Sequence, residues 1–228
     1  ITNQGTNVKA SSPTTQPRQT LDKPHTNLKL ATLNVNCAKI NRTPFDLTEE
    51  IDRFMKTHNI SICALTETDF KSFKEASDFN IEGYTTILPN NKNESKKVRV
   101  VIVVKNSLTR NIRQRSDFGG GDIVWMELNL PKTKKYMFGA TYREWGSGAS
   151  KCIGQQIERI NQMAAEFEFV SKMSCSTWVA GDWNLDGARF DDESWHLKSV
   201  ATSLTDMMSA AGFSRIKVGP TPQVAEDG

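Results

Sequence analysis

Short apolar runs of strand length, interleaved with longer runs at helical spacing, most constrain how this chain can fold. A strand-like run over 28–36 precedes a helix that begins at Thr43-Pro44, and a second strand over 60–66 follows it. Four strand-like runs come next, at 84–88, 99–105, 122–130 and 135–142, with a hairpin turn at 131–134 between the last two. A helix over 152–172, a strand over 177–180 and a helix over 195–211 complete the order. This order predicts an α/β (α+β) domain in which helices cover two sheets.

The composition sets the limits of that domain. Residues 1–27 are mostly Thr, Asn, Gln, Ser and Pro, which predicts a disordered linker before a domain over 28–228. No run approaches the roughly 18 apolar residues of a membrane span. The four cysteines lack metal-ligand spacing, which favours a reducing, intracellular compartment. A net charge of +3 permits a nucleic-acid partner without requiring one.

Polar residues recur where the predicted strands end. Asn and Asp after a strand are commonly turn formers, so each of these residues alone is weak evidence for a site. Their shared position is stronger evidence, because sites in layered α/β proteins collect at the carboxyl ends of strands. The set consists of Asn34, Asn36, Glu67, Tyr142, Asp182 and Asn184.

These residue types suit hydrolysis of a phosphodiester. That reaction needs a hard divalent cation, a group that deprotonates or orients water, and donors for the phosphate oxygens. Glu67 can bind the cation and Asp182 can act as the base. The amides of Asn34 and Asn184 and the hydroxyl of Tyr142 can donate to phosphate.

Four motifs in order resemble the endonuclease/exonuclease/phosphatase superfamily, and especially the apurinic-like endonuclease domain of non-LTR retrotransposon polyproteins. The resemblance implies a four-layer α/β sandwich with two facing mixed sheets. It implies that Glu67 binds Mg²⁺ or Mn²⁺ with support from Asn36, that Asn34 and Asn184 orient phosphate, that Tyr142 touches it, and that Asp182 activates water. The motifs are Leu33-Asn34-Val35-Asn36, Leu65-Thr66-Glu67-Thr68, Thr141-Tyr142 and Gly181-Asp182-Trp183-Asn184.

The resemblance also implies a biological setting. A domain of this kind nicks target DNA for retrotransposon integration, is joined to a reverse transcriptase, and acts in the nucleus. The family closes with a Ser-Asp-His-like motif, whereas this sequence stops at Gly228, and His25, His58 and His196 are not placed to substitute. We therefore expect a C-terminally truncated domain that lacks its last strands, leaves a sheet edge unpaired, and has impaired activity.

Basic and aromatic residues suggest where DNA would lie. The segment 92–115 is rich in Lys and Arg, which is typical either of a backbone-contacting patch or of a solvated surface loop. The predicted DNA contacts are Lys96, Lys97, Arg99, Arg143 and Trp145, the last as a stacking platform or as a packing anchor. Two other functions stay open, namely a phosphatase or phosphodiesterase for small phosphate esters and a non-catalytic DNA-binding remnant.

Overall fold

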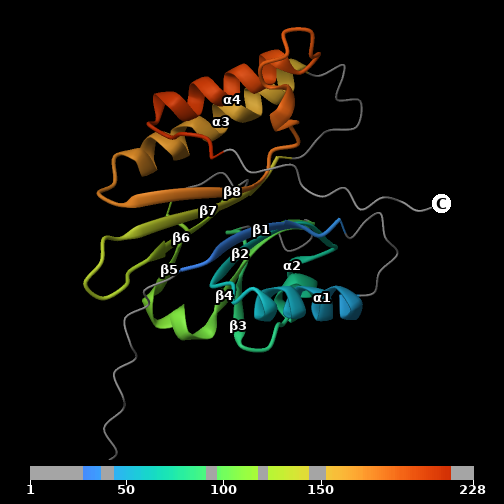
Figure 1. Ribbon diagram of the computed structural model, residues 1–228, viewed down its shortest axis with the longest axis vertical. Coiled ribbons are helices and arrows are strands. Elements are labelled where there is room, and N and C mark those ends of the chain that lie inside the picture. Colours follow the sequence, from blue (N-terminus) through green and yellow to red (C-terminus); the bar gives the residue numbers. More distant parts are fainter. Residues whose placement is uncertain (1–27, 37–43, 91–96, 118–122, 144–152, 217–228) are drawn as a thin grey trace, which may run out of the picture.

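The computed structural model describes residues 28–36, 44–90, 97–117, 123–143 and 153–216. Two four-stranded sheets lie face to face, and helices cover both outer faces (Figure 1). The first sheet has the order β1-β2-β4-β3 and the second has the order β5-β6-β7-β8. This arrangement confirms the predicted α/β sandwich with two mixed sheets.

The strands and helices have the following bounds. The first sheet contains β1 (Leu30–Asn34), β2 (Ile62–Phe70), β3 (Tyr84–Ile87) and β4 (Val98–Lys105). The second contains β5 (Ile112–Arg115), β6 (Ile123–Leu128), β7 (Tyr136–Tyr142) and β8 (Ser176–Asp182). The α-helices are α1 (Pro44–Thr57), α2 (Phe73–Asp78), α3 (Ile153–Ser171) and α4 (Lys198–Ala210). Among the described residues, 3-10 helices span Asn106–Asn111 and Gly187–Arg189.

Alternation along β2 and β4 builds two core layers at once. Cys63 and Leu65 pack in the cluster that includes Ile51 and Met55 of α1. Their neighbours Ile62 and Ala64 face the opposite way, into the cluster between the two sheets. Because successive side chains of a strand point to opposite faces, apolar residues at both parities bury both faces of this sheet.

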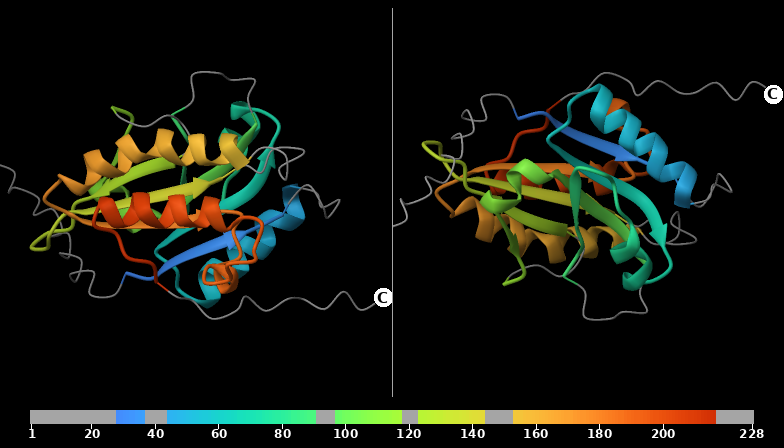
Figure 2. Two further views of the ribbon diagram at one scale, coloured as in Figure 1. Left: turned by 90° about the horizontal axis from the view of Figure 1, so that it is seen from above. Right: turned by 90° about the horizontal axis from the view of Figure 1, so that it is seen from below.

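The second sheet packs against α3 and α4 on its outer face. Trp125 lies edge-on to Phe167 of α3, with ring centroids 6.0 Å apart, and donates its indole N–H to Glu166 at 2.7 Å. The two views of Figure 2 show α3 and α4 side by side over this sheet, with α1 over the other. Within the described residues, no helix is both long enough and apolar enough to cross a membrane.

The structure corrects three details of the sequence reading. β2 does not end at Thr66 but continues to Phe70 through an irregular stretch. The short helix α2 and the edge strand β5 have no counterpart among the predicted elements. Both are short, six and four residues, so neither offers enough periodicity to be seen in the sequence.

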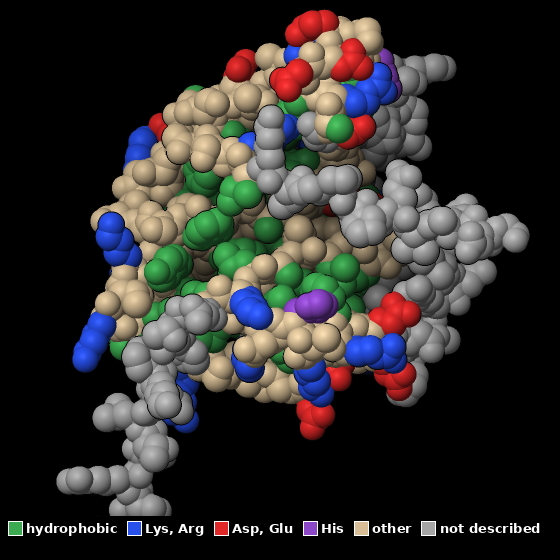
Figure 3. Space-filling model, in the orientation of Figure 1, with side chains coloured by type: hydrophobic (Ala, Val, Ile, Leu, Met, Phe, Trp, Pro, Cys, Tyr) green, Lys and Arg blue, Asp and Glu red, His purple; other side chains and the backbone are tan. Residues whose placement is uncertain are grey.

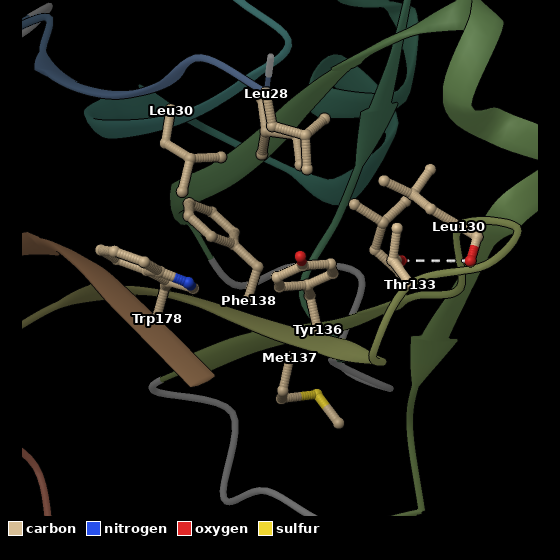
Figure 4. Close-up of a pocket in the computed structure, with 10 residues that line it drawn as sticks. Leu28, Leu30, Leu130, Thr133, Tyr136, Met137, Phe138 and Trp178 are labelled. Carbon is tan, nitrogen blue, oxygen red and sulfur yellow. Dashed lines mark hydrogen bonds between the residues drawn. The ribbon is translucent and has the colours of Figure 1, made fainter. Parts of the chain in front are cut away.

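One side of the sandwich is open. On the described part of the chain, β1 pairs only with β2 and β8 pairs only with β7, so their outer edges carry no strand partner. Hydrophobic side chains are visible between these two edges in Figure 3. They form a groove of about 390 Å³ at the amino ends of β1, β7 and β8, lined in part by Leu30, Phe138 and Trp178 (Figure 4). Leu30 and Trp178 are 37% and 44% exposed.

Candidate active site

A hydrogen bond between the two sheets defines the centre of the site. Asn34 at the end of β1 donates its Nδ2 to Oδ2 of Asp182 at the end of β8, over 2.8 Å. The two residues are 148 positions apart in the sequence. β1 and β8 point toward the same end of the molecule (Figure 1), so the strand ends meet there, opposite the apolar groove.

Both oxygens of the Asp182 carboxylate are held. The backbone N–H of Asn184 donates to Oδ1 of Asp182 at 2.7 Å, while Asn34 occupies Oδ2. Asn34 is oriented in turn, because its Oδ1 accepts the backbone N–H of Asn36 at 3.0 Å. This chain fixes which side of the Asn34 amide faces Asp182. An amide nitrogen carries two hydrogens, so Asn34 keeps one for a phosphate oxygen.

Glu67 and Asn36 supply oxygen atoms that suit a hard cation. Among the described residues, Oδ1 of Asn36 is buried without a hydrogen-bond donor, and the Glu67 side chain makes no ion pair or hydrogen bond. Asn34 pairs with Thr66 in the β1–β2 register, which brings the residues that follow each of them together. The described residues hold no cluster of three or more His, Cys, Asp or Glu placed for a metal. A site of one carboxylate, one amide oxygen and water fits Mg²⁺, which keeps several of its waters.

A bulge in β2 turns Glu67 out of the regular strand. Thr66 pairs with Val100 and Phe70 pairs with Val98, so residues 67–69 lie opposite the single residue 99. Glu67 and Asp69 have φ values of 54° and 47°. Non-glycine residues with positive φ are uncommon and concentrate at functional sites.

The other strand ends of the site share this backbone conformation. Asn36 and Asn184 have φ values of 43° and 50°. Together with Glu67 and Asp69 they are four of the six non-glycine residues with positive φ in the described ranges. Sequence periodicity carries no signal for such conformations, except that Asn and Asp tolerate them better than other residues do.

Tyr142 is joined to the bulge through Arg99. The Arg99 guanidinium lies over the Tyr142 ring, 5.6 Å from its centroid, and its Nε is 3.4 Å from Oδ1 of Asp69. In the β7–β8 register Tyr142 pairs with Asp182, so Tyr142 belongs to the same strand end. Asp69 is a further candidate residue, absent from the sequence-based set, because nothing in the sequence reveals the bulge that turns it toward Arg99.

The structure does not support the predicted DNA contact of Arg143. Its side chain is only 3% exposed and points beneath the turn after β8. Nε donates to the Trp183 carbonyl at 2.5 Å, and Nη2 donates to the Asn184 carbonyl at 2.9 Å. Nη1 donates to Oε1 of Gln156 in α3. Burial lowers the pKa of this guanidinium to about 10, and the charge of Asp182 opposes that shift.

The other predicted DNA contacts divide between described and undescribed positions. Lys96 and Trp145 lie outside the described residues, as do the linker 1–27 and the C-terminal residues 217–228. Lys97 is exposed and precedes β4 at the site end of the sheet, because β4 runs antiparallel to β2. The basic segment is not one patch, since Arg115 is buried and bonds Glu127 and Asp117.

Gly181 lets β8 approach β7 beside the carboxylate. Its φ is +146°, and a Cβ at this position would lie 1.9 Å from the Thr141 carbonyl oxygen. Only glycine fits a backbone that passes so close to its neighbour. The glycine before Asp182 therefore sets the strand separation on which the site depends.

Comparison with solved structures identifies this architecture. The endonuclease domain of TRAS1, a telomere-specific non-LTR retrotransposon, superposes with a TM-score of 0.58 at 14% identity, over 86% of this chain and 76% of that domain. An AP endonuclease from Archaeoglobus fulgidus gives 0.57 at 15% identity, over 81% and 71% of the two chains. The chain has the endonuclease/exonuclease/phosphatase fold.

The endonuclease/exonuclease/phosphatase fold is shared by proteins with different substrates. A mannosyl-6-phosphatase from Bacteroides thetaiotaomicron matches this chain with a TM-score of 0.55 at 12% identity, over 79% of this chain and 70% of the phosphatase. No family model and no curated protein matches the sequence. At these identities the likeness establishes the fold, and the function has to be argued from the site.

Proposed function

We propose that this chain is a metal-dependent phosphodiester hydrolase that nicks DNA. The observation that carries the proposal is the Asn34–Asp182–Asn184 network, in which two sheets hold one carboxylate by both oxygens. Such a carboxylate is fixed in place before substrate arrives, which is what a general base requires. Glu67 and Asn36 follow the paired residues Thr66 and Asn34, and their side-chain oxygens would suit a divalent cation.

In the proposed mechanism, each residue has a separate task. Asp182 takes a proton from the attacking water while its geometry is kept by Asn34 and Asn184. The water oxygen bonds to phosphorus as the bond from phosphorus to the 3′-oxygen breaks, and the leaving 3′-oxygen takes a proton from solvent. The second amide hydrogen of Asn34 and the hydroxyl of Tyr142 donate to the phosphate oxygens. Glu67 and Asn36 would hold Mg²⁺ or Mn²⁺, and the bound cation would neutralise charge that develops on the phosphate.

DNA is favoured over a small phosphate ester by the cations at the site end. Lys97 is exposed there, and Arg99 is 30% exposed beside Tyr142. Backbone phosphates on both sides of the scissile bond can use such cations, whereas a small ester has no flanking phosphate to offer. The phosphatase with the same fold keeps the small-ester function as the second candidate.

The similarity to the TRAS1 endonuclease domain supports the more specific proposal of a retrotransposon nuclease. In that role the nick would expose a 3′-hydroxyl in target DNA, the chain would be joined to a reverse transcriptase, and the reaction would occur in the nucleus. The test compares Mg²⁺-dependent nicking of supercoiled plasmid with release of phosphate from mannose 6-phosphate. Hydrolysis of the sugar phosphate alone would favour the phosphatase function instead.

We also propose that the basal rate of residues 1–228 is low. Within the described residues, neither histidine joins the Asp182 network: the His58 ring lies tilted against Phe54, with centroids 5.0 Å apart, and His196 is exposed before α4. A donor beside the scissile phosphate is worth about 10²–10³ in rate. Nicking is therefore best measured under single-turnover conditions with enzyme in excess.

Replacement of Glu67 by Gln is expected to weaken metal binding more than it weakens DNA binding. The substitution removes the charge of the only carboxylate assigned to the cation while keeping the size of the side chain. The Mg²⁺ concentration for half-maximal nicking should rise by about tenfold or more. Glu75→Gln, at a carboxylate that caps α2, is the matched control. An unchanged Mg²⁺ titration for Glu67→Gln would remove Glu67 from the metal site.

Neutralising Lys96, Lys97 and Arg99 together is expected to flatten the salt dependence of DNA binding. The slope of log affinity against log salt should fall by roughly 0.9 for each phosphate contact that is lost. Fluorescence anisotropy with a labelled duplex, at several salt concentrations, measures the Kd and hence this slope. Neutralising Lys132 and Lys134, in the turn before β7 and far from the site, should leave the slope alone. Equal slopes in both variants would show that the basic segment is only solvated.

A further inference from the structure

The turn that carries Asp182 and Asn184 rests on a buried cation that the proposed mechanism does not use. Arg143 follows Tyr142 directly, and its side chain enters the space between β8 and α3. Its guanidinium donates to the carbonyls of Trp183 and Asn184 and to the side chain of Gln156. A planar guanidinium can bond several acceptors in a fixed geometry, and an ammonium cannot.

The backbone of Arg143 also forms hydrogen bonds with the same turn. Its N–H donates to the Asp182 carbonyl at 2.9 Å, and its carbonyl accepts Nδ2 of Asn184 at 2.5 Å. Five hydrogen bonds thus connect Arg143 to the Asp182–Asn184 turn and to α3. Asn184 is held most tightly, because both its side chain and its carbonyl bond Arg143.

We propose that Arg143 is a positioning residue, which sets the place of the Asp182 carboxylate through the Asp182–Asn184 turn without touching DNA. This inference rests on the proposed function of Asp182 as the general base. The path is short: Arg143 fixes Asn184, and the Asn184 N–H fixes Oδ1 of Asp182. Gln156 accepts a hydrogen bond from the guanidinium, so the position of α3 also fixes the position of the turn. A displacement near 1 Å at a reacting group can cost about 100-fold in rate.

Two substitutions separate positioning from DNA contact. Arg143→Met removes the donors and the charge but keeps a long side chain. Arg143→Lys keeps the charge and can bond only part of the acceptor set. Arg53→Met is the matched control, because Arg53 is exposed on α1. For each protein, the single-turnover nicking rate at saturating DNA, the Kd for a labelled duplex and the salt slope of that Kd are measured.

The positioning role predicts a rate effect without a binding effect. Arg143→Met should slow nicking by about 100-fold, with Kd and salt slope unchanged, and Arg143→Lys should recover about tenfold of that loss. Arg53→Met should behave as the unmodified protein. A raised Kd with a salt slope lowered by about one, at an unchanged saturating rate, would overturn the proposal in favour of a DNA contact.

Hydrogen exchange keeps the test independent of activity and of the proposed function. The peptide that contains residues 182–185 should exchange faster in Arg143→Met, since the Trp183 and Asn184 carbonyls lose the guanidinium donors that hold the turn in place. If the unmodified protein nicks no plasmid while this exchange difference is present, the proposed function fails and the positioning contact stands. If Arg143→Met, still folded by its melting curve, changes neither exchange nor rate, the positioning role is wrong.

Discussion

Asp182→Asn is expected to reduce single-turnover nicking of supercoiled plasmid by about 10³-fold or more. The substitution removes the base, and general base catalysis contributes about 10²–10⁴ in rate. It also disturbs the network, because an amide nitrogen at Oδ2 would face the Nδ2 donor of Asn34. Asn34 cannot turn its amide around without losing the N–H of Asn36 at its Oδ1.

DNA binding should survive this substitution. Removing one negative charge from a surface that approaches phosphates leaves the Kd for a labelled duplex unchanged or lower. Asp186→Asn is the matched control, since Asp186 is an exposed carboxylate four residues later that accepts the Ala188 N–H. If Asp182→Asn and Asp186→Asn nick plasmid equally fast, Asp182 is not the base and the proposed mechanism is wrong.

Gly181→Ala is expected to destabilise the protein by about 3 kcal/mol and to abolish nicking at 37 °C. The added Cβ would lie 1.9 Å from the Thr141 carbonyl oxygen, so β7 and β8 would have to separate. The positive φ of +146° adds backbone strain for any residue other than glycine. A loss of this size corresponds to a Tm lower by roughly 6–12 °C for a domain of this length.

Gly154→Ala provides the comparison for that experiment. Gly154 lies in α3, and a Cβ there meets nothing within 4 Å. Alanine in a helix is favoured over glycine by about 1 kcal/mol, so this variant should melt at the same temperature or higher. Thermal melting by circular dichroism measures both variants. Equal melting temperatures for Gly181→Ala and the unmodified protein would show that β7 and β8 tolerate a wider separation.

Most of the fold could be predicted because burial follows the period of each element. β4 is buried at nearly every position, and its Val and Ile residues predict a central strand. The helix α3 was predicted within one residue at each end, from a stripe that includes Ile160 and Phe167. α2 and β5 could not be predicted, because their short runs carry too few residues to show a period.

The site was predictable in its residue types and unpredictable in its backbone. Asn34 and Asp182 follow apolar runs, so their place at strand ends is visible in the sequence. The bulge at 67–69 is not visible, since its Thr68 hydroxyl is held by the Val98 carbonyl from another strand, at 2.9 Å. Arg143 was misread for a related reason: an arginine beside a site residue reads as a surface cation until its buried acceptors are known.

The left-handed backbone at Glu67 has a consequence for which residues the position can accept without a loss of stability. A non-glycine residue in this conformation costs about 1–2 kcal/mol, which glycine does not incur. Glu67→Gly would therefore relieve strain while deleting the proposed metal ligand. Under the proposed function, the protein keeps a strained glutamate at a cost in stability because the Glu67 carboxylate holds the cation.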